Sequence, residues 1–130
     1  MFANKQYLLP RILIGLMALV MLAATIPSYF NPTMNPGLTT LTGPALSLGE
    51  TAGAFLGRQL TLILIALIGT FMGHRHLVMI GGFAMMFMNG HDAIFMGLMG
   101  GPASAAIAGF VFAAIAAITI VLVWRKPLVD

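Results

Sequence analysis

Residues 57 to 75 read GRQLTLILIALIGTFMGHR, and the apolar middle of this stretch decides the fold. Between Gln59 and His74 no side chain is charged, and leucine and isoleucine predominate. A helix that crosses the hydrocarbon core of a bilayer needs about 20 mostly apolar residues. The stretch reaches that length when it is extended back to Thr51, so we predict a transmembrane helix over residues 51–71.

Three further stretches have the same length and apolar character, and we predict spans over residues 8–26, 77–99 and 103–124. The whole chain is 60% hydrophobic and 7% charged, with a mean hydropathy of +1.03, whereas soluble domains carry about 25% charged residues. A chain of 130 residues cannot bury that much apolar surface within itself, so the surface faces lipid. We predict an all-α transmembrane four-helix bundle, with residues 1–130 forming a single membrane domain.

The positive residues indicate how the spans are oriented. Lys5 and Arg11 precede the first helix, Arg75 separates the second from the third, and Arg125 and Lys126 follow the fourth. Five of the six Lys and Arg residues therefore lie on one side, which predicts cytoplasmic termini in a bacterial-type inner membrane. A cleaved signal peptide is the alternative for the first span, but no convincing small-residue cleavage site follows it. Because the charges are scattered, a nucleic-acid partner is not expected.

The one long connection, residues 27–50, is predicted to lie on the outer side. Pro27 is expected to end the first helix, and two Asn-Pro steps follow at Pro32 and Pro36. Asn-Pro steps disfavour helix and favour turns. We therefore expect an extended, turning loop that lies across the outer end of the bundle as a cap.

Small residues recur at every fourth position in the second and fourth spans. They are Gly49, Gly53, Gly57 and Thr61, and Ala105, Gly109, Ala113 and Ala117. Such strips let helix backbones approach closely inside a membrane. We expect these two strips to pack the second and fourth spans tightly within one subunit; the alternative is that one strip forms a homodimer face.

Two opposite charges lie inside the predicted spans. Arg58 and Asp92 are each about 10 Å below the outer boundary, since a helix rises 1.5 Å per residue. A lone charge within a span costs at least about 2.5–3.5 kcal/mol. Opposite charges at one depth offset much of that cost, so we predict an Arg58–Asp92 ion pair.

Other polar residues collect near this depth. Asn89 lies on nearly the same helix face as Asp92, whereas His91 is about 100° around the helix and is expected to face a neighbouring span. Three interpretations are open: a pair that sets the helix register, a site for a small amphiphile such as a quinone headgroup or lipid, and a proton or ion path. The candidate ligand-binding residues are Glu50, Arg58, Gln59, Asn89, His91 and Asp92.

Nothing in the sequence predicts catalysis, a cofactor or a metal site. The absence of cysteine excludes thiol chemistry. Eleven methionines and three histidines suggest copper as an alternative. The methionines lack the spacing of a copper-conducting helix, however, and His74 and His76 lie in a short turn, so no metal is expected.

GRQLTLILIALIGTFMGHR (57–75), followed by GGFAMMFMNGHDAIF (81–95), resembles the DoxX-like superfamily of small four-helix membrane proteins. The resemblance covers roughly residues 8 to 125. It implies a four-helix membrane fold with Arg58, Gln59 and Asp92 as its polar centre. The named member of the group is similar to a subunit of a thiosulfate:quinone oxidoreductase. The long outer loop and the methionine-rich third helix depart from the usual pattern, which leaves the substrate open.

We therefore expect an inner-membrane protein that binds a small hydrophobic or quinone-like molecule and has no catalysis of its own. One alternative is an accessory subunit that contacts other membrane subunits or forms a homo-oligomer. A small transporter dependent on Asp92 is the other alternative.

Overall fold

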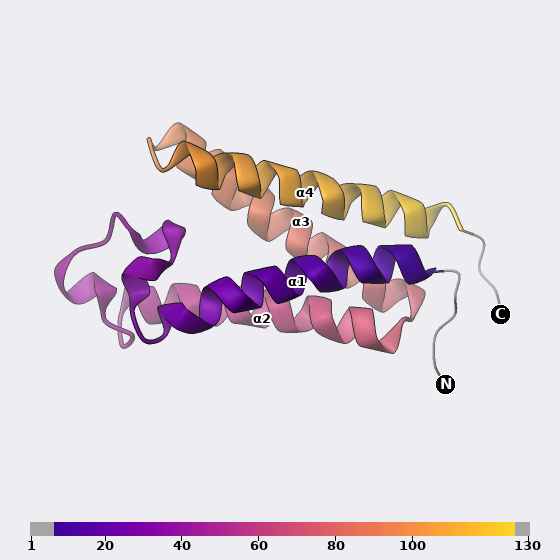
Figure 1. Ribbon diagram of the computed structural model, residues 1–130, viewed down its shortest axis with the longest axis horizontal. Helices are drawn as coiled ribbons and strands as arrows, with labels where there is room; N and C mark the ends of the chain where they lie inside the picture. Colours follow the sequence, from indigo (N-terminus) through magenta and orange to yellow (C-terminus); the bar gives the residue numbers. More distant parts are fainter. Residues whose placement is uncertain (1–6, 127–130) are drawn as a thin grey trace.

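The computed structural model describes residues 7–126, and this part of the chain is built from helices (Figure 1). The four long helices are α1 (Leu8–Ser28), α2 (Thr51–Met72), α3 (Arg75–Leu98) and α4 (Ala103–Trp124). Each is long and apolar enough to cross a membrane, as a multi-pass integral membrane protein requires. Every end agrees with the predicted spans to within one helical turn, which confirms the all-helical, four-span architecture.

The sequence predicted that the first helix would end at Pro27. The helix instead continues through Pro27 and ends at Ser28. A proline in the last turn removes only one backbone hydrogen bond. The carbonyl oxygens of Ile26 and Pro27 still accept hydrogen bonds from the N–H groups of Tyr29 and Phe30, at 3.1 and 3.0 Å. The helix therefore ends after the proline, where the chain turns.

The positive residues gather at one end of the bundle. Figure 1 shows the start of α1, the α2–α3 turn and the end of α4 at that end, opposite the long loop. Arg11, Arg75, Arg125 and Lys126 occupy these three places, whereas Lys5 lies outside the described residues. The arrangement is the one that the positive residues predicted, and the side of the membrane that this end faces stays a prediction.

Two of these arginines also complete the ends of neighbouring helices. Arg11 donates from Nε to the carbonyl oxygen of Thr70 at 2.7 Å and from Nη2 to that of Phe71 at 3.2 Å. Arg75 donates from Nη2 to the carbonyl oxygen of Trp124 at 3.1 Å. The last carbonyl groups of a helix lack partners within it and carry the negative end of its dipole. The guanidinium groups therefore stabilise the ends of α2 and α4.

The helices pack mainly on their neighbours in the chain, so α3 lies between α2 and α4. All four contribute to one apolar core, whose fully packed members are Ile14, Met17, Ala18, Ile63, Ala66, Met85, Met88 and Ala116. Methionine suits this role because its flexible side chain fills irregular gaps. The core thus explains part of the methionine content without a metal.

The two strips of small residues do not pack on each other, which corrects the sequence-based expectation. A Cβ at Gly109 would lie 2.8 Å from both the Ala93 Cβ and the Asn89 carbonyl oxygen, so the α4 strip is pressed against α3. Gly53 instead meets the backbone of Leu48, and Gly57 has no atom within 4 Å of the position its Cβ would occupy. The four-residue spacing identified the two strips of small residues. Which helix each strip contacts depends on the order of the helices in space.

The sequence predicted an extended, turning loop between α1 and α2. The loop instead forms three short 3-10 turns: Pro32–Met34, Pro36–Leu38 and Gly43–Leu46. The first two turns have proline in their first residues and an asparagine before them. The side-chain oxygens of Asn31 and Asn35 accept hydrogen bonds from the N–H groups of Thr33 and Gly37. This capping is the arrangement that favours a short helical turn. Leu38 then anchors the loop in a second core with Ala52 and Leu56.

Candidate functional site

Three adjoining pockets lie at the loop end of the bundle, and all three are lined by Phe55 of α2 and Asp92 of α3. The loop pocket, of about 150 Å³, lies among the Asn35–Gly37 segment and all four helices. The lateral pocket, of about 290 Å³, lies between α2 and α3. The mouth pocket, of about 380 Å³, lies between the loop and the α3–α4 turn. Asp92 is therefore the acidic group at which the three meet.

A buried pair of amides joins the loop to α2 beside the loop pocket. Asn35 and Gln59 are only 4% and 8% exposed, and the Asn35 Nδ2 donates to the Gln59 Oε1 at 2.9 Å. The Asn35 Oδ1 accepts from the Gly37 N–H at 2.9 Å, so both ends of this side chain are occupied. Gln59 was a predicted site residue, whereas sequence reasoning missed Asn35. The two Asn-Pro steps suggested a turn and gave no sign of this long-range partner.

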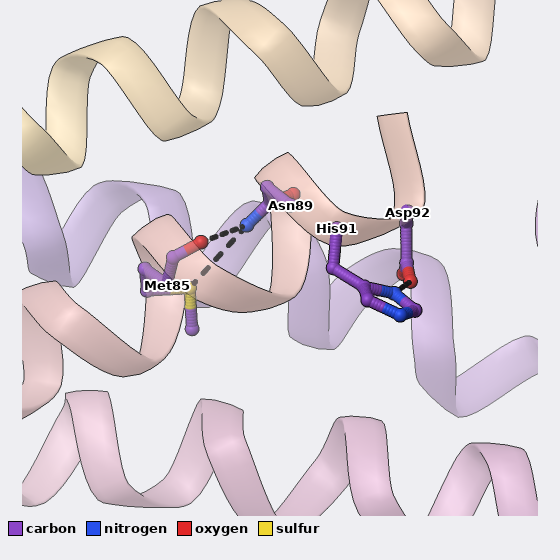
Figure 2. A network of polar contacts seen from close by, with 4 residues as sticks. All are labelled: Met85, Asn89, His91 and Asp92. Atoms are coloured by element: carbon purple, nitrogen blue, oxygen red, sulfur yellow. Dashed lines mark hydrogen bonds and ion pairs between the residues drawn. The ribbon is translucent and has the colours of Figure 1, made fainter. Parts of the chain in front are cut away.

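Asn89 brings a third buried amide to the loop pocket. It is 5% exposed, and its Nδ2 donates to the Met85 carbonyl oxygen, one turn earlier on α3, at 2.8 Å. The amide oxygen points away from that bond (Figure 2). Within the described residues that oxygen accepts no hydrogen bond, so it is available to accept one.

The sequence predicted that His91 faces a neighbouring span and not Asp92; it does line the lateral pocket between α2 and α3, but its imidazole also contacts Asp92. Its Nδ1 lies 3.1 Å from the Asp92 Oδ1 (Figure 2). The expectation considered only the directions of the Cβ atoms, whereas side chains at adjacent positions can bend toward each other through their own torsions. The side chains of His91 and Asp92 are 51% and 32% exposed, respectively, so the pair lies open to the surroundings of the bundle.

The predicted ion pair between Arg58 and Asp92 is not formed. Within residues 7–126 the partner of the Asp92 carboxylate is the His91 imidazole, a contact that is an ion pair only when the imidazole is protonated, and Arg58 makes no side-chain hydrogen bond there. Both side chains nevertheless line the lateral pocket, and Arg58 is exposed. Arg58 and Asp92 line one pocket because they lie at the same depth. Depth alone does not make them contact each other, and Asp92 contacts the adjacent His91 imidazole instead.

Glu50 is not brought into the site. It is exposed at the start of α2, makes no side-chain cap there, and lines none of the four pockets described. The other five predicted residues all line at least one of the pockets that meet at Asp92. Phe55, which sequence reasoning missed, lines all three pockets and is indistinguishable in the sequence from any lipid-facing phenylalanine.

An aromatic row on α3 also escaped the sequence reasoning. Phe83, Phe87, His91 and Phe95 recur at every fourth position, with ring centroids 6.2, 5.9 and 4.6 Å apart in turn. All four side chains are at least half exposed. The four-residue spacing was the available signal, because it places side chains one above another on a helix.

Comparisons with protein-family models, with curated proteins and with solved structures find no match to this chain. The class of protein therefore follows from the fold, which is that of a four-helix, multi-pass membrane protein. Within the described residues no group of three His, Asp or Glu side chains is placed to hold a metal ion. The site instead offers amide and carboxylate hydrogen-bonding groups inside an apolar wall.

Proposed function

We propose that this protein binds a small amphiphile, such as a quinone or a lipid, in the three pockets that meet at Asp92. The convergence of those pockets on one carboxylate is the observation that carries the proposal. Small-molecule sites are mostly apolar, with a few placed polar groups, and occupy about 300–1,000 Å³. The mouth pocket alone, at about 380 Å³, reaches that range.

The chemistry of the lining supports a ligand with a polar head and an apolar body. Around the loop pocket the polar groups are Asn35, Gln59, Asn89 and Asp92. The mouth pocket continues outward along Phe95, Met96 and Met99. In this proposal the head lies against Asn89 and Asp92, and the body follows the phenylalanine and methionine side chains, whose contacts with rings are favourable.

Binding of decylubiquinol, whose hydroxyl groups can donate to Asn89 and Asp92, and of a short-chain phosphatidylethanolamine, whose ammonium group can do the same, to the protein in nanodiscs tests the proposal. We expect Asp92→Asn and Asn89→Leu each to weaken binding of the cognate probe about tenfold, because a hydrogen bond to a charged or buried group is lost. Glu50→Gln is the matched control, since it removes a carboxylate outside the pockets, and should bind normally. If neither probe binds, or if both site variants bind as tightly as the unaltered protein, the proposal is wrong.

The same proposal includes the cellular setting and the relationship expected from the sequence. We place the protein in a bacterial-type inner membrane with cytoplasmic termini, as a divergent relative of the DoxX-like proteins without catalysis of its own. The gathering of Arg11, Arg75, Arg125 and Lys126 at one end supports this orientation.

A role as an accessory subunit is the second candidate, and the exposed aromatic row favours it. Three phenylalanines and a histidine in one line on α3 form a surface suited to packing against another transmembrane chain. Native mass spectrometry of protein extracted in mild detergent tests both candidates at once. A retained small molecule supports ligand binding, whereas a retained foreign subunit supports the accessory role.

A further inference from the structure

The ionisable side chains in the middle of the spans all lie on one face. Within residues 7–126, Arg11, Arg75 and His76 lie in terminal turns of their helices. Only Arg58, His91 and Asp92 lie deeper, and all three line the lateral pocket between α2 and α3. The face formed by these three residues, with Phe83 and Phe87 beside them on α3, is called the charged face below.

In a single copy the charged face is costly to expose to lipid. Arg58 is exposed without a hydrogen bond inside the described chain, and the Asp92 side chain is 32% exposed. Charged groups within a span are expensive unless they face protein, water or each other. A cover that offers a carboxylate to Arg58 and a guanidinium to Asp92 satisfies both groups, whereas a hydrocarbon chain satisfies neither.

We propose that a second copy of this chain covers the charged face in a two-fold symmetric dimer. An axis along the membrane normal keeps every residue at its own depth, and Arg58 and Asp92 are both about 10 Å from the loop ends of α2 and α3. The symmetry therefore brings Arg58 of one copy opposite Asp92 of the other, twice. The ion pair that is absent within one chain forms between two chains.

The surface around the charges fits this occupant. The neighbouring α2 positions are small: Ala54 and Thr61 are exposed, and the space beside Gly57 is open. Small residues allow close approach between membrane helices, and Phe83 and Phe87, at 57% and 59% exposure, supply area for packing. A surface that carries a carboxylate beside a guanidinium is complementary to its own two-fold symmetric copy, which supplies a partner for each charge. An anionic lipid headgroup would supply a partner for Arg58 only.

Cysteine cross-linking tests the interface without altering the charges, because the chain contains no cysteine. Single variants Phe83→Cys and Phe87→Cys are oxidised in native membranes. The controls are Val20→Cys on α1 and Ile107→Cys on α4, which are 55% and 64% exposed. We expect covalent dimer at one or both α3 positions at a yield at least about fivefold above both controls. Equal yields at all four positions overturn the proposal.

Charge exchange between copies then distinguishes pairing between chains from pairing within one chain. Arg58→Asp and Asp92→Arg proteins carrying different affinity tags are expressed alone and together. Each variant alone places like charges at the interface, so we expect dimer formation to fall about tenfold. In the mixed dimer both interchain positions again hold opposite charges, one pair with its sign reversed and one with the original sign, so co-purification of the two tags should recover.

The outcomes of the exchange are decisive. Recovery in the mixture supports the dimer, because pairing within a chain remains repulsive in both variants. Recovery only in the Arg58→Asp/Asp92→Arg double variant means that the pair forms within one chain, and it overturns the proposal. Dimer formation that is insensitive to every charge change also overturns it. Both proposals involve Asp92 and the lateral pocket, but neither readout measures ligand binding, so the dimer can fail while the proposed ligand stands.

Discussion

At the scale of single residues, the contact between Asn35 and Gln59 ties the loop to the bundle. It links a loop residue to a span residue 24 positions away in the sequence, with both side chains buried. Removing one amide leaves the other buried without a partner, which costs about 1–3 kcal/mol. Replacing both with apolar groups removes the unmatched polar atoms as well.

A double-mutant cycle tests this contact. Gln59→Leu and Asn35→Leu are each expected to lower the free energy of unfolding in detergent by about 1–3 kcal/mol, and the double variant by less than the sum of the two. Thermal unfolding followed by circular dichroism provides the measurement. Strictly additive losses would show that the two amides stabilise the protein through separate partners.

At the scale of elements, the close contact between α3 and α4 depends on the missing side chain of Gly109. A methyl group there would meet the Asn89 carbonyl oxygen and Ala93 at 2.8 Å, and helix backbones do not yield cheaply to such overlap. Gly97 lies near the end of α3 and has no atom within 4 Å of the position its Cβ would occupy. Gly97 is therefore a suitable control position for a substitution at Gly109.

We expect Gly109→Ala to destabilise the protein by about 1–3 kcal/mol, because the helices must separate to admit the methyl group. Gly97→Ala should be neutral, or stabilising by up to about 1 kcal/mol, since alanine favours helix over glycine. Melting temperatures of the two variants in the same detergent check the contrast. A Gly109→Ala protein as stable as Gly97→Ala would mean that the α3–α4 contact is looser than described.

At the scale of the whole molecule, the bundle has a positively charged end and a loop end. The loop carries exposed Thr39, whereas exposed Arg125 follows α4 at the opposite end. The absence of cysteine again allows single reporter positions to be introduced on an unreactive background.

Labelling with a membrane-impermeant maleimide tests the orientation. Thr39→Cys should react in intact spheroplasts, and Arg125→Cys only after the membrane is permeabilised, because positive residues remain on the cytoplasmic side. The unaltered chain is the control for background labelling. The reverse pattern would place the positive end outside and refute the predicted topology.

Much of the architecture was predictable from the sequence. The four spans could be placed because an apolar stretch of the right length must satisfy its backbone hydrogen bonds internally, and only a helix does this within one segment. Arg58, Gln59, Asn89, His91 and Asp92 could be named because polar residues are rare at that depth. Pro27, the loop turns and the helix that each small strip contacts were predicted wrongly, because each depends on neighbours that no local pattern specifies.

The sequence by itself determined the number, the length and the chemistry of the helices, because hydrophobic length and backbone satisfaction are local properties of a chain in lipid. The tertiary structure alone decided that Asp92 pairs with His91, that Asn35 reaches Gln59, and that three pockets meet beside Phe55. The first depends on the torsions of two adjacent side chains, and the other two depend on the rotation and order of the helices. Those are set by the packing of all four against one another, and a residue's depth in its own span carries no information about them.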